Sequence, residues 1–212
     1  MKKLFIFDLD GTLVDAYGAI SSSLNFTRKQ LGYSQISYKT VKESVGKGDR
    51  IFINMFFAKK DQEKALRIYR CHHRQSLQKK VKALPMSRRV LFNLKRRGKK
   101  ISIASNRPTL YTNIILERLD FRKYIDFILC ADKIKRIKPD PAILLKTLRY
   151  FKVKREEAVF IGDMIIDVKT AKTAGVDGLF VKGGSTKVRE LKKQYPQVPV
   201  LASLEDILKM YE

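Results

Sequence analysis

Cysteine, acidic side chains and long apolar runs are scarce in this 212-residue chain, and tryptophan is absent. The two cysteines, Cys71 and Cys130, stand far apart and lack the spacing of metal ligands, so buried, reduced thiols are expected. No run of about 18 apolar residues occurs, and no membrane-spanning helix is expected. The apolar start at Leu4–Phe7 is interrupted by Asp8 and Asp10 before it reaches the length of a signal peptide. We therefore expect a cytoplasmic protein that does not bind membranes.

The shortage of acidic residues leaves a large positive charge. Against 21 Asp and Glu stand 45 Lys and Arg, a formal net charge of +24, which attracts anionic partners. The basic residues are spread along expected helix faces and turns, for example at Lys79-Lys80 and Lys192-Lys193. No nucleic-acid-binding motif accompanies them. The sequence thus leaves nucleic acid open as a partner but favours a solvated basic surface.

The apolar pattern predicts an α/β fold. A strand is expected at residues 3–9, and helical periodicity then runs through residues 17–83 without a strong strand candidate. From Pro85 onward, helices alternate with strands at 101–104, 127–130, 158–161, 179–181 and 198–201. Such alternation predicts a parallel, Rossmann-like sheet covered by helices on both faces. We expect a catalytic core of residues 1–16 and 84–212, with 17–83 inserted as an all-helical cap.

Polar side chains follow several of the expected strands. The carboxyl ends of parallel strands meet at one edge of a sheet, where active sites of this class lie, so these side chains are expected to share one crevice. Two carboxylates at the end of a buried strand are costly to place without a partner such as a metal ion. In chain order the candidates are Asp8, Asp10, Thr12, Ser105, Asn106, Lys138, Asp163 and Asp167.

Each candidate has a plainer interpretation when taken alone. Ser105-Asn106 is a typical helix N-cap, Lys138 precedes a proline in an ordinary turn, and Asp163 and Asp167 suit the first turn of a helix. Their joint occurrence at the expected strand ends favours a catalytic site instead.

The chain resembles the haloacid dehalogenase-like (HAD) hydrolase superfamily in four motifs that occur in order. They are Asp8-Leu9-Asp10-Gly11-Thr12, then Ser105, then Lys138, then Gly162-Asp163 with Asp167. The resemblance covers almost the whole chain, and the helical insertion is similar to the family's small cap. It implies a Mg²⁺-dependent phosphatase that acts on a small phosphorylated metabolite through an aspartyl-phosphate.

The resemblance also implies a role for each motif residue. Asp8 would be the nucleophile, and Asp10 would protonate the leaving oxygen and then deprotonate the attacking water. Asp167 would support the metal or orient Lys138. The implied Mg²⁺ ligands are Asp8, the backbone carbonyl of Asp10, Asp163 and Asp167, and the implied phosphate-binding residues are Thr12, Ser105, Asn106 and Lys138.

Within the expected cap, residues 45–50 resemble a loop of phosphoglycolate phosphatase-like proteins. Lys47 and Arg50 are predicted to meet a second anionic group of the substrate, although a plain helix–helix turn explains the loop equally well.

Asp10 argues against dehalogenase activity. A phosphosugar mutase, and a pyrophosphatase, nucleotidase or polynucleotide-end phosphatase suited to the positive charge, stay open as alternatives. Two departures from relatives are Met164, where a small hydroxyl residue is common, and Arg107, where lysine is common. Oligomeric state is left open.

Overall fold

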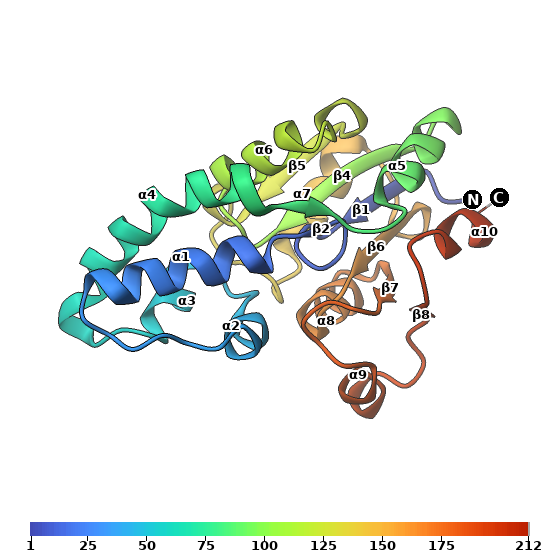
Figure 1. Cartoon of the computed structure of the whole chain (residues 1–212). Coiled ribbons are helices and arrows are strands. Elements are labelled where there is room, and N and C mark those ends of the chain that lie inside the picture. The colour runs from blue at the N-terminus through green and yellow to red at the C-terminus, as the bar shows by residue number, and fades with distance from the viewer. Residues whose placement is uncertain (212) are drawn as a thin grey trace.

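A parallel β-sheet forms the centre of the computed structural model, which describes residues 1–211 (Figure 1). The strand order is β5-β4-β1-β6-β7-β8, and each neighbouring pair is parallel. The strand that carries the first motif therefore lies inside the sheet, with β4 and β6 as its neighbours. The strands are β1 (Leu4–Phe7), β4 (Lys100–Ser105), β5 (Phe127–Cys130), β6 (Ala158–Gly162), β7 (Asp177–Val181) and β8 (Val200–Leu201).

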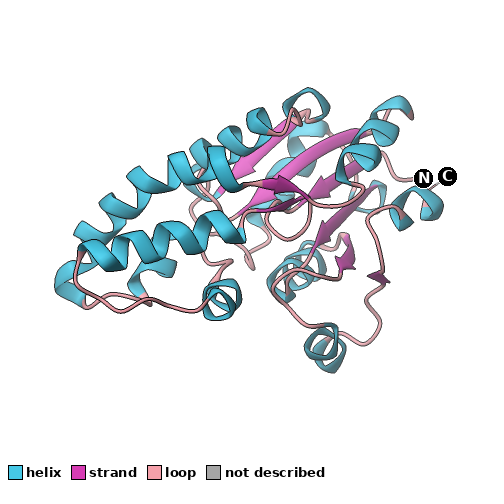
Figure 2. Ribbon diagram, viewed as in Figure 1, coloured by secondary structure: helices cyan, strands magenta, loops and turns pink. Residues whose placement is uncertain are grey.

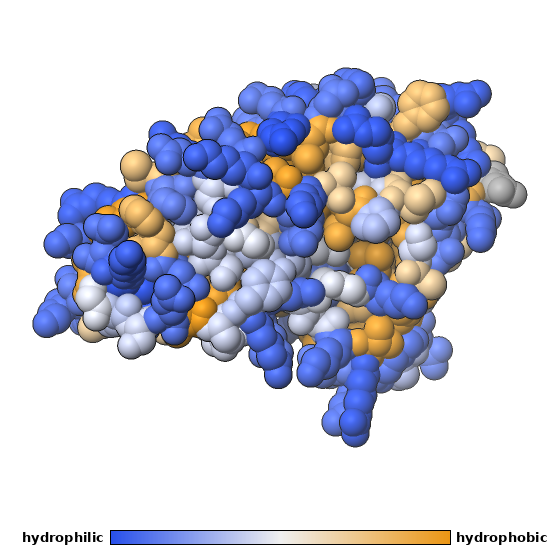
Figure 3. Space-filling model, viewed as in Figure 1, coloured by the Kyte–Doolittle hydropathy of each residue, from blue (hydrophilic) through white to orange (hydrophobic). Residues whose placement is uncertain are grey.

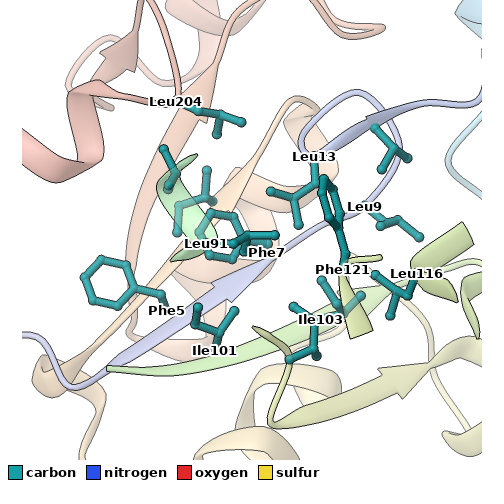
Figure 4. Packing of buried hydrophobic residues seen from close by; sticks show 14 of the residues in the cluster. Phe5, Phe7, Leu9, Leu13, Leu91, Ile101, Ile103, Leu116, Phe121 and Leu204 are labelled. Carbon is teal, nitrogen blue, oxygen red and sulfur yellow. The ribbon is translucent and has the colours of Figure 1, made fainter. Parts of the chain in front are cut away.

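Strand β1 is buried on both faces because its side chains alternate between two hydrophobic clusters. Phe5 and Phe7 point into the larger cluster, where Figure 4 shows Phe7 beside Leu91. Leu4 and Ile6 point into the opposite cluster. An uninterrupted apolar run is what a strand covered on both sides requires.

Helices cover both faces of this sheet (Figure 2). Residues of α5, α6 and α10 belong to the cluster of Phe5 and Phe7, and residues of α7 and α8 belong to that of Leu4 and Ile6. Helix α9 packs against Phe180 of β7 through Leu191. The bounds are α5 (Ser87–Arg96), α6 (Thr109–Arg118), α7 (Ala142–Phe151), α8 (Ile165–Ala174), α9 (Val188–Gln194) and α10 (Asp206–Met210), with 3₁₀ turns at Arg122–Tyr124, Ala131–Lys133 and Arg155–Glu157.

The segment between β1 and α5 is helical and has a hydrophobic cluster of its own, which includes Tyr17, Leu24, Phe52 and Leu66. Its two long helices, α1 and α4, pack along each other and project away from the sheet (Figure 1). A short antiparallel pair, β2 (Val14–Asp15) and β3 (Lys82–Ala83), joins the segment to the core where the chain leaves and returns. The helices are α1 (Tyr17–Gln30), α2 (Tyr38–Ser44), α3 (Asp49–Asn54), a 3₁₀ turn (Lys59–Asp61) and α4 (Gln62–Lys80).

The predicted fold class is confirmed, while two details differ. Strands β2 and β3 lack any sequence signal, because each is two residues long. The expectation that both thiols are buried is wrong for Cys71, which is exposed on α4, whereas Cys130 is buried.

None of the helices in residues 1–211 has the length and apolar character needed to span a bilayer. Hydrophilic side chains cover most of the face seen in Figure 3, with apolar ones in small separate groups.

Candidate active site

A pocket lies between the carboxyl ends of the central strands and the helical segment. The core contributes Asp8 after β1, Ser105 at the end of β4, and Lys138. Because β1, β4 and β6 are parallel neighbours, their ends bring polar residues from distant parts of the sequence to one place. The pocket is lined by Asp8, Asp10, Ile20, Val45, Gly46, Gly48, Asp49, Phe52, Tyr69, His73, Ser105, Asn106, Arg107, Pro108, Tyr111, Lys138, Met164 and Ile166.

Lys138 binds the carboxylates of both Asp8, which lines the pocket, and Asp167, which lies behind it. Its Nζ lies 2.7 Å from Asp8 Oδ1 and 2.8 Å from Asp167 Oδ1, and all three residues are buried. Burial opposes the lysine charge, but Asp167 and Asp8 outweigh it and raise the pKa of Lys138. Burial and Asp8 raise the pKa of Asp167 to about 6 although Lys138 lowers it.

Asp163 completes an acidic cluster with Asp8 and Asp167, each of which offers one carboxylate oxygen within 4.8 Å of those of the other two. Thr12 Oγ1 donates to Asp163 Oδ1 at 3.1 Å, and the backbone N–H of Ser185 donates to Oδ2 at 2.9 Å. Burial, then the charges of Asp167 and Asp8, raise the pKa of Asp163 to about 8. Three buried carboxyl groups thus crowd around the single positive charge of Lys138, and this crowding favours the protonated form of Asp163.

Asp10 is held differently, by Arg107. Arg107 Nε and Nη2 lie 2.8 Å and 2.7 Å from the same oxygen, Asp10 Oδ2. The other oxygen, Oδ1, is buried and has no hydrogen-bond partner within residues 1–211. Asp10 thus lines the pocket with one carboxylate oxygen held by Arg107 and the other buried without a partner in residues 1–211.

Asn106 and Ser105 shape the pocket beside Asp8. Asn106 Oδ1 accepts from the backbone N–H of Lys138 at 2.9 Å, and Asn106 Nδ2 donates to the carbonyl of Lys138 at 3.0 Å and to that of Gly46 at 2.8 Å. Ser105 Oγ accepts from the N–H of Arg107 at 3.3 Å. Asn106 therefore fixes the Lys138 backbone and also contacts the helical segment.

The loop after α2 closes tightly over Met164. A Cβ on Gly46, whose φ is +109°, would lie 2.5 Å from Met164 Cε, so glycine permits this approach. Lys47 and Arg50 do not line the pocket: both are exposed, and Arg50 forms an ion pair with Glu63.

Of the motif residues, the structure places Asp8, Asp10, Ser105, Asn106 and Lys138 at the pocket. Thr12, Asp163 and Asp167 do not line it; they belong to the adjoining polar cluster through the contacts above. Sequence reasoning missed several neighbours of the site. They are Tyr17, whose hydroxyl lies 3.3 Å from Asp163 Oδ2, Ser185, and the aromatic lining of Tyr69, His73 and Tyr111.

Comparison with known proteins agrees with this fold. The family model for haloacid dehalogenase-like hydrolases matches residues 5–181. The chain is 29% identical over 210 residues to a phosphoglycolate phosphatase of Aquifex aeolicus, covering 99% of this chain and 97% of that protein. It is 30% identical over 192 residues to a candidate pyrophosphatase of Caldanaerobacter subterraneus, covering 90% and 86%.

Among solved structures, one from Haemophilus somnus, described as a predicted phosphoglycolate phosphatase, superimposes with a TM-score of 0.92. It covers 100% of this chain and 98% of its own at 22% identity, and so supports the fold. The match to the family model, over most of the chain, decides the family. This chain belongs to the haloacid dehalogenase-like hydrolases and is a phosphatase of that family.

Proposed function

We propose that this phosphatase hydrolyses a small phosphomonoester with Mg²⁺ and with Asp8 as its nucleophile. The acidic cluster fits the metal, because Asp8, Asp163 and Asp167 offer oxygen ligands within 4.8 Å of one another and Lys138 leaves part of their charge unbalanced. Bound there, Mg²⁺ would reduce the repulsion between the nucleophile and an anionic phosphate.

In the first half of the reaction an oxygen of Asp8 attacks phosphorus. The new bond joins Asp8 to the phosphoryl group, and the bond from phosphorus to the ester oxygen breaks. Lys138, 2.7 Å from Asp8 Oδ1, keeps this carboxylate in place in a buried site and offsets charge in the transition state. Ser105 and the N–H of Asn106 would hold the phosphoryl oxygens.

Asp10 would act as acid and then as base. Asp10 lines the same pocket as Asp8, and its Oδ1 has no hydrogen-bond partner in residues 1–211, so this oxygen could give a proton to the leaving oxygen and later take one from the attacking water. That water hydrolyses the aspartyl-phosphate, releasing phosphate and restoring Asp8. The shared pocket of Asp8, Asp10 and Lys138 is the observation that carries the proposal.

We also propose that residues 17–83 act as a cap on a core of residues 1–16 and 84–212. The helical segment has its own apolar cluster and supplies one wall of the pocket, through residues such as Ile20, Phe52 and His73. Phosphoglycolate is the first substrate to test, because a relative of nearly equal length is named for it. Pyrophosphate is the second, because another relative is named as a candidate pyrophosphatase.

Phosphate release tests these proposals. It would be measured with Mg²⁺ and with a chelator on phosphoglycolate, pyrophosphate, sugar phosphates, nucleoside monophosphates and a 3′-phosphorylated oligonucleotide. We expect Mg²⁺-dependent release that Asp8→Asn abolishes, while the exposed Asp120→Asn serves as a matched control and keeps wild-type rates. Retained activity in Asp8→Asn would refute the nucleophile. Preference for the oligonucleotide would point to a polynucleotide end, and transfer between sugar phosphates without release would point to a mutase.

The predicted cap contacts can be tested on the same panel. If Lys47 and Arg50 meet a second anionic group of the substrate, Lys47→Ala and Arg50→Ala raise KM for phosphoglycolate but not for 4-nitrophenyl phosphate. Unchanged or equally changed KM values for both substrates would contradict that role.

A further inference from the structure

Arg107 joins the catalytic core to the helical segment. Its Nε and Nη2 bind Asp10 Oδ2, and its Nη1 lies 2.8 Å from His73 Nε2 on α4. All of these contacts are buried or partly buried, and Arg107 is 9% exposed. A guanidinium commonly binds both oxygens of a carboxylate with two parallel N–H groups. Here two donors converge on one oxygen, and a third is turned toward the histidine.

Arg107 must be the donor and His73 the acceptor in the hydrogen bond between them. A guanidinium has donors and no acceptor, so His73 Nε2 accepts and the ring proton resides on Nδ1. Nδ1 lies 3.2 Å from Ser23 Oγ, whose own hydroxyl donates to the carbonyl of Ala19 at 2.9 Å. Burial and the charge of Arg107 lower the pKa of His73 well below its usual value. His73 is thus a neutral acceptor.

Aromatic neighbours hold the ring of His73. It stacks on Tyr69 with ring centroids 4.9 Å apart, and it meets Tyr111 edge-on at 5.1 Å. Tyr69 lies on α4, as His73 does, whereas Tyr111 lies on α6 of the core. The acceptor for Arg107 is therefore placed by both sides of the pocket.

We infer that His73 is a positioning residue that acts through Arg107 on Asp10. By engaging Nη1, His73 keeps the guanidinium turned so that its other donors bind Oδ2 alone and leave Oδ1 of Asp10 without a partner among the described residues. The inference rests on the proposed acid and base role of Asp10. It makes the proton-transfer geometry of the core depend on the packing of α4, since the acceptor comes from the helical segment.

The test is His73→Phe, which keeps an aromatic ring between the tyrosines but removes the acceptor. His73→Gln keeps an acceptor without the ring. His72→Phe is the control, because His72 is the next residue on α4 and stacks on Phe26. Its Nδ1 lies 3.1 Å from the same Ser23 Oγ that His73 contacts, so this variant measures what the shared serine contact alone contributes. Turnover would be measured with Mg²⁺ on phosphoglycolate, whose alkyl leaving group needs a proton, and on 4-nitrophenyl phosphate, whose leaving group does not.

We expect His73→Phe to lower kcat on phosphoglycolate about tenfold or more, part of the roughly hundredfold or larger effect of general acid–base catalysis, with little change in KM. On 4-nitrophenyl phosphate it should release one equivalent of nitrophenolate rapidly and then turn over slowly, because the second half-reaction still needs the base. His73→Gln should recover most of the rate, and His72→Phe should match the wild type. In Asp10→Asn, adding His73→Phe should cause no further loss.

A wild-type kcat in folded His73→Phe would overturn the inference, as would an additive loss in the double variant. Should His73→Phe fail to fold, His73→Leu, which also removes the acceptor, must show the same burst and the same non-additivity with Asp10→Asn. The two proposals fail differently. If Asp10→Asn itself keeps the wild-type rate, the acid and base role is wrong; if Asp10→Asn is slow but His73→Phe is not, the positioning role alone is wrong.

Discussion

Asp163→Asn should make the metal-free protein more stable than the wild type, by an amount that grows as the pH rises. The substitution removes one of three clustered carboxylates without losing hydrogen bonds. The amide oxygen can accept from the N–H of Ser185, as Oδ2 does now, and the amide nitrogen can donate to Thr12, whose hydroxyl accepts as well as donates. The change therefore removes charge repulsion and desolvation cost while the local structure is kept.

The magnitude follows from the pKa of Asp163, which is raised from 3.8 to about 8. The folded state keeps the proton while the unfolded state loses it, so the proton's contribution to stability is complete below pH 3.8 and is lost as the pH rises to about 8. The loss is about 1.4 kcal/mol per pH unit, or roughly 6 kcal/mol in total. The variant has no such carboxyl. Its advantage should grow from pH 5 to pH 8 and then level off.

Urea unfolding at pH 5, 6, 7 and 8 with a chelator measures this slope directly. The same series with Mg²⁺ provides the second arm: the wild type should gain stability as the metal binds its folded state, and Asp163→Asn should gain much less. A stability difference that stays flat between pH 5 and pH 8 would refute the burial argument. An equal gain from Mg²⁺ in both proteins would refute Asp163 as a ligand.

Two further substitutions test other parts of the site. Lys138→Met leaves Asp8 without its buried partner and should destabilise the metal-free protein by about 3 kcal/mol in urea unfolding; it should also lower kcat about a hundredfold or more in the phosphate-release assay. Unchanged values would contradict the buried ion pair. Gly46→Ala places a Cβ 2.5 Å from Met164 Cε at a positive φ and should raise KM several-fold, whereas Gly18→Ala, with open space around it, should not. Equal KM values in the two would show that the approach of this loop to Met164 does not govern binding.

Much of the core could be predicted because the signals were local. The apolar run ending at Asp8 predicted β1, and Pro85, Gly98 and the runs after them predicted the alternating pattern; β5 has the predicted bounds, Phe127–Cys130. The carboxyl ends of parallel strands lie at the same edge of the sheet, so the motif residues that follow β1, β4 and β6 could be expected to meet before their distances were known. Other bounds were less exact: β1 and β8 are both shorter than the predicted 3–9 and 198–201.

The parts that sequence missed depend on packing between distant elements. Nothing local distinguishes His73 from His72, yet one reaches Arg107 and the other stacks on Phe26. The same holds for Ser185, which follows β7 and meets Asp163 only through the fold. Lys47 had the charge expected of a binding residue, but its exposed position depends on how the loop around Gly46 closes over Met164.

The β2–β3 pair means that the helical segment can be replaced without changing where the chain leaves and re-enters the core. Val14 pairs with Ala83 and Asp15 pairs with Lys82, so the chain enters and leaves the insertion at adjacent points. For the core, everything between these residues is a loop whose ends are already joined, and even a doubling of its length would add only about 0.6 kcal/mol of closure entropy. A segment of different length and shape can therefore be joined at the same stem while the acidic cluster beneath it stays intact. Diversity of substrate can then arise by replacing one contiguous stretch of sequence, as long as the new stretch again supplies an acceptor for Arg107 where His73 does now.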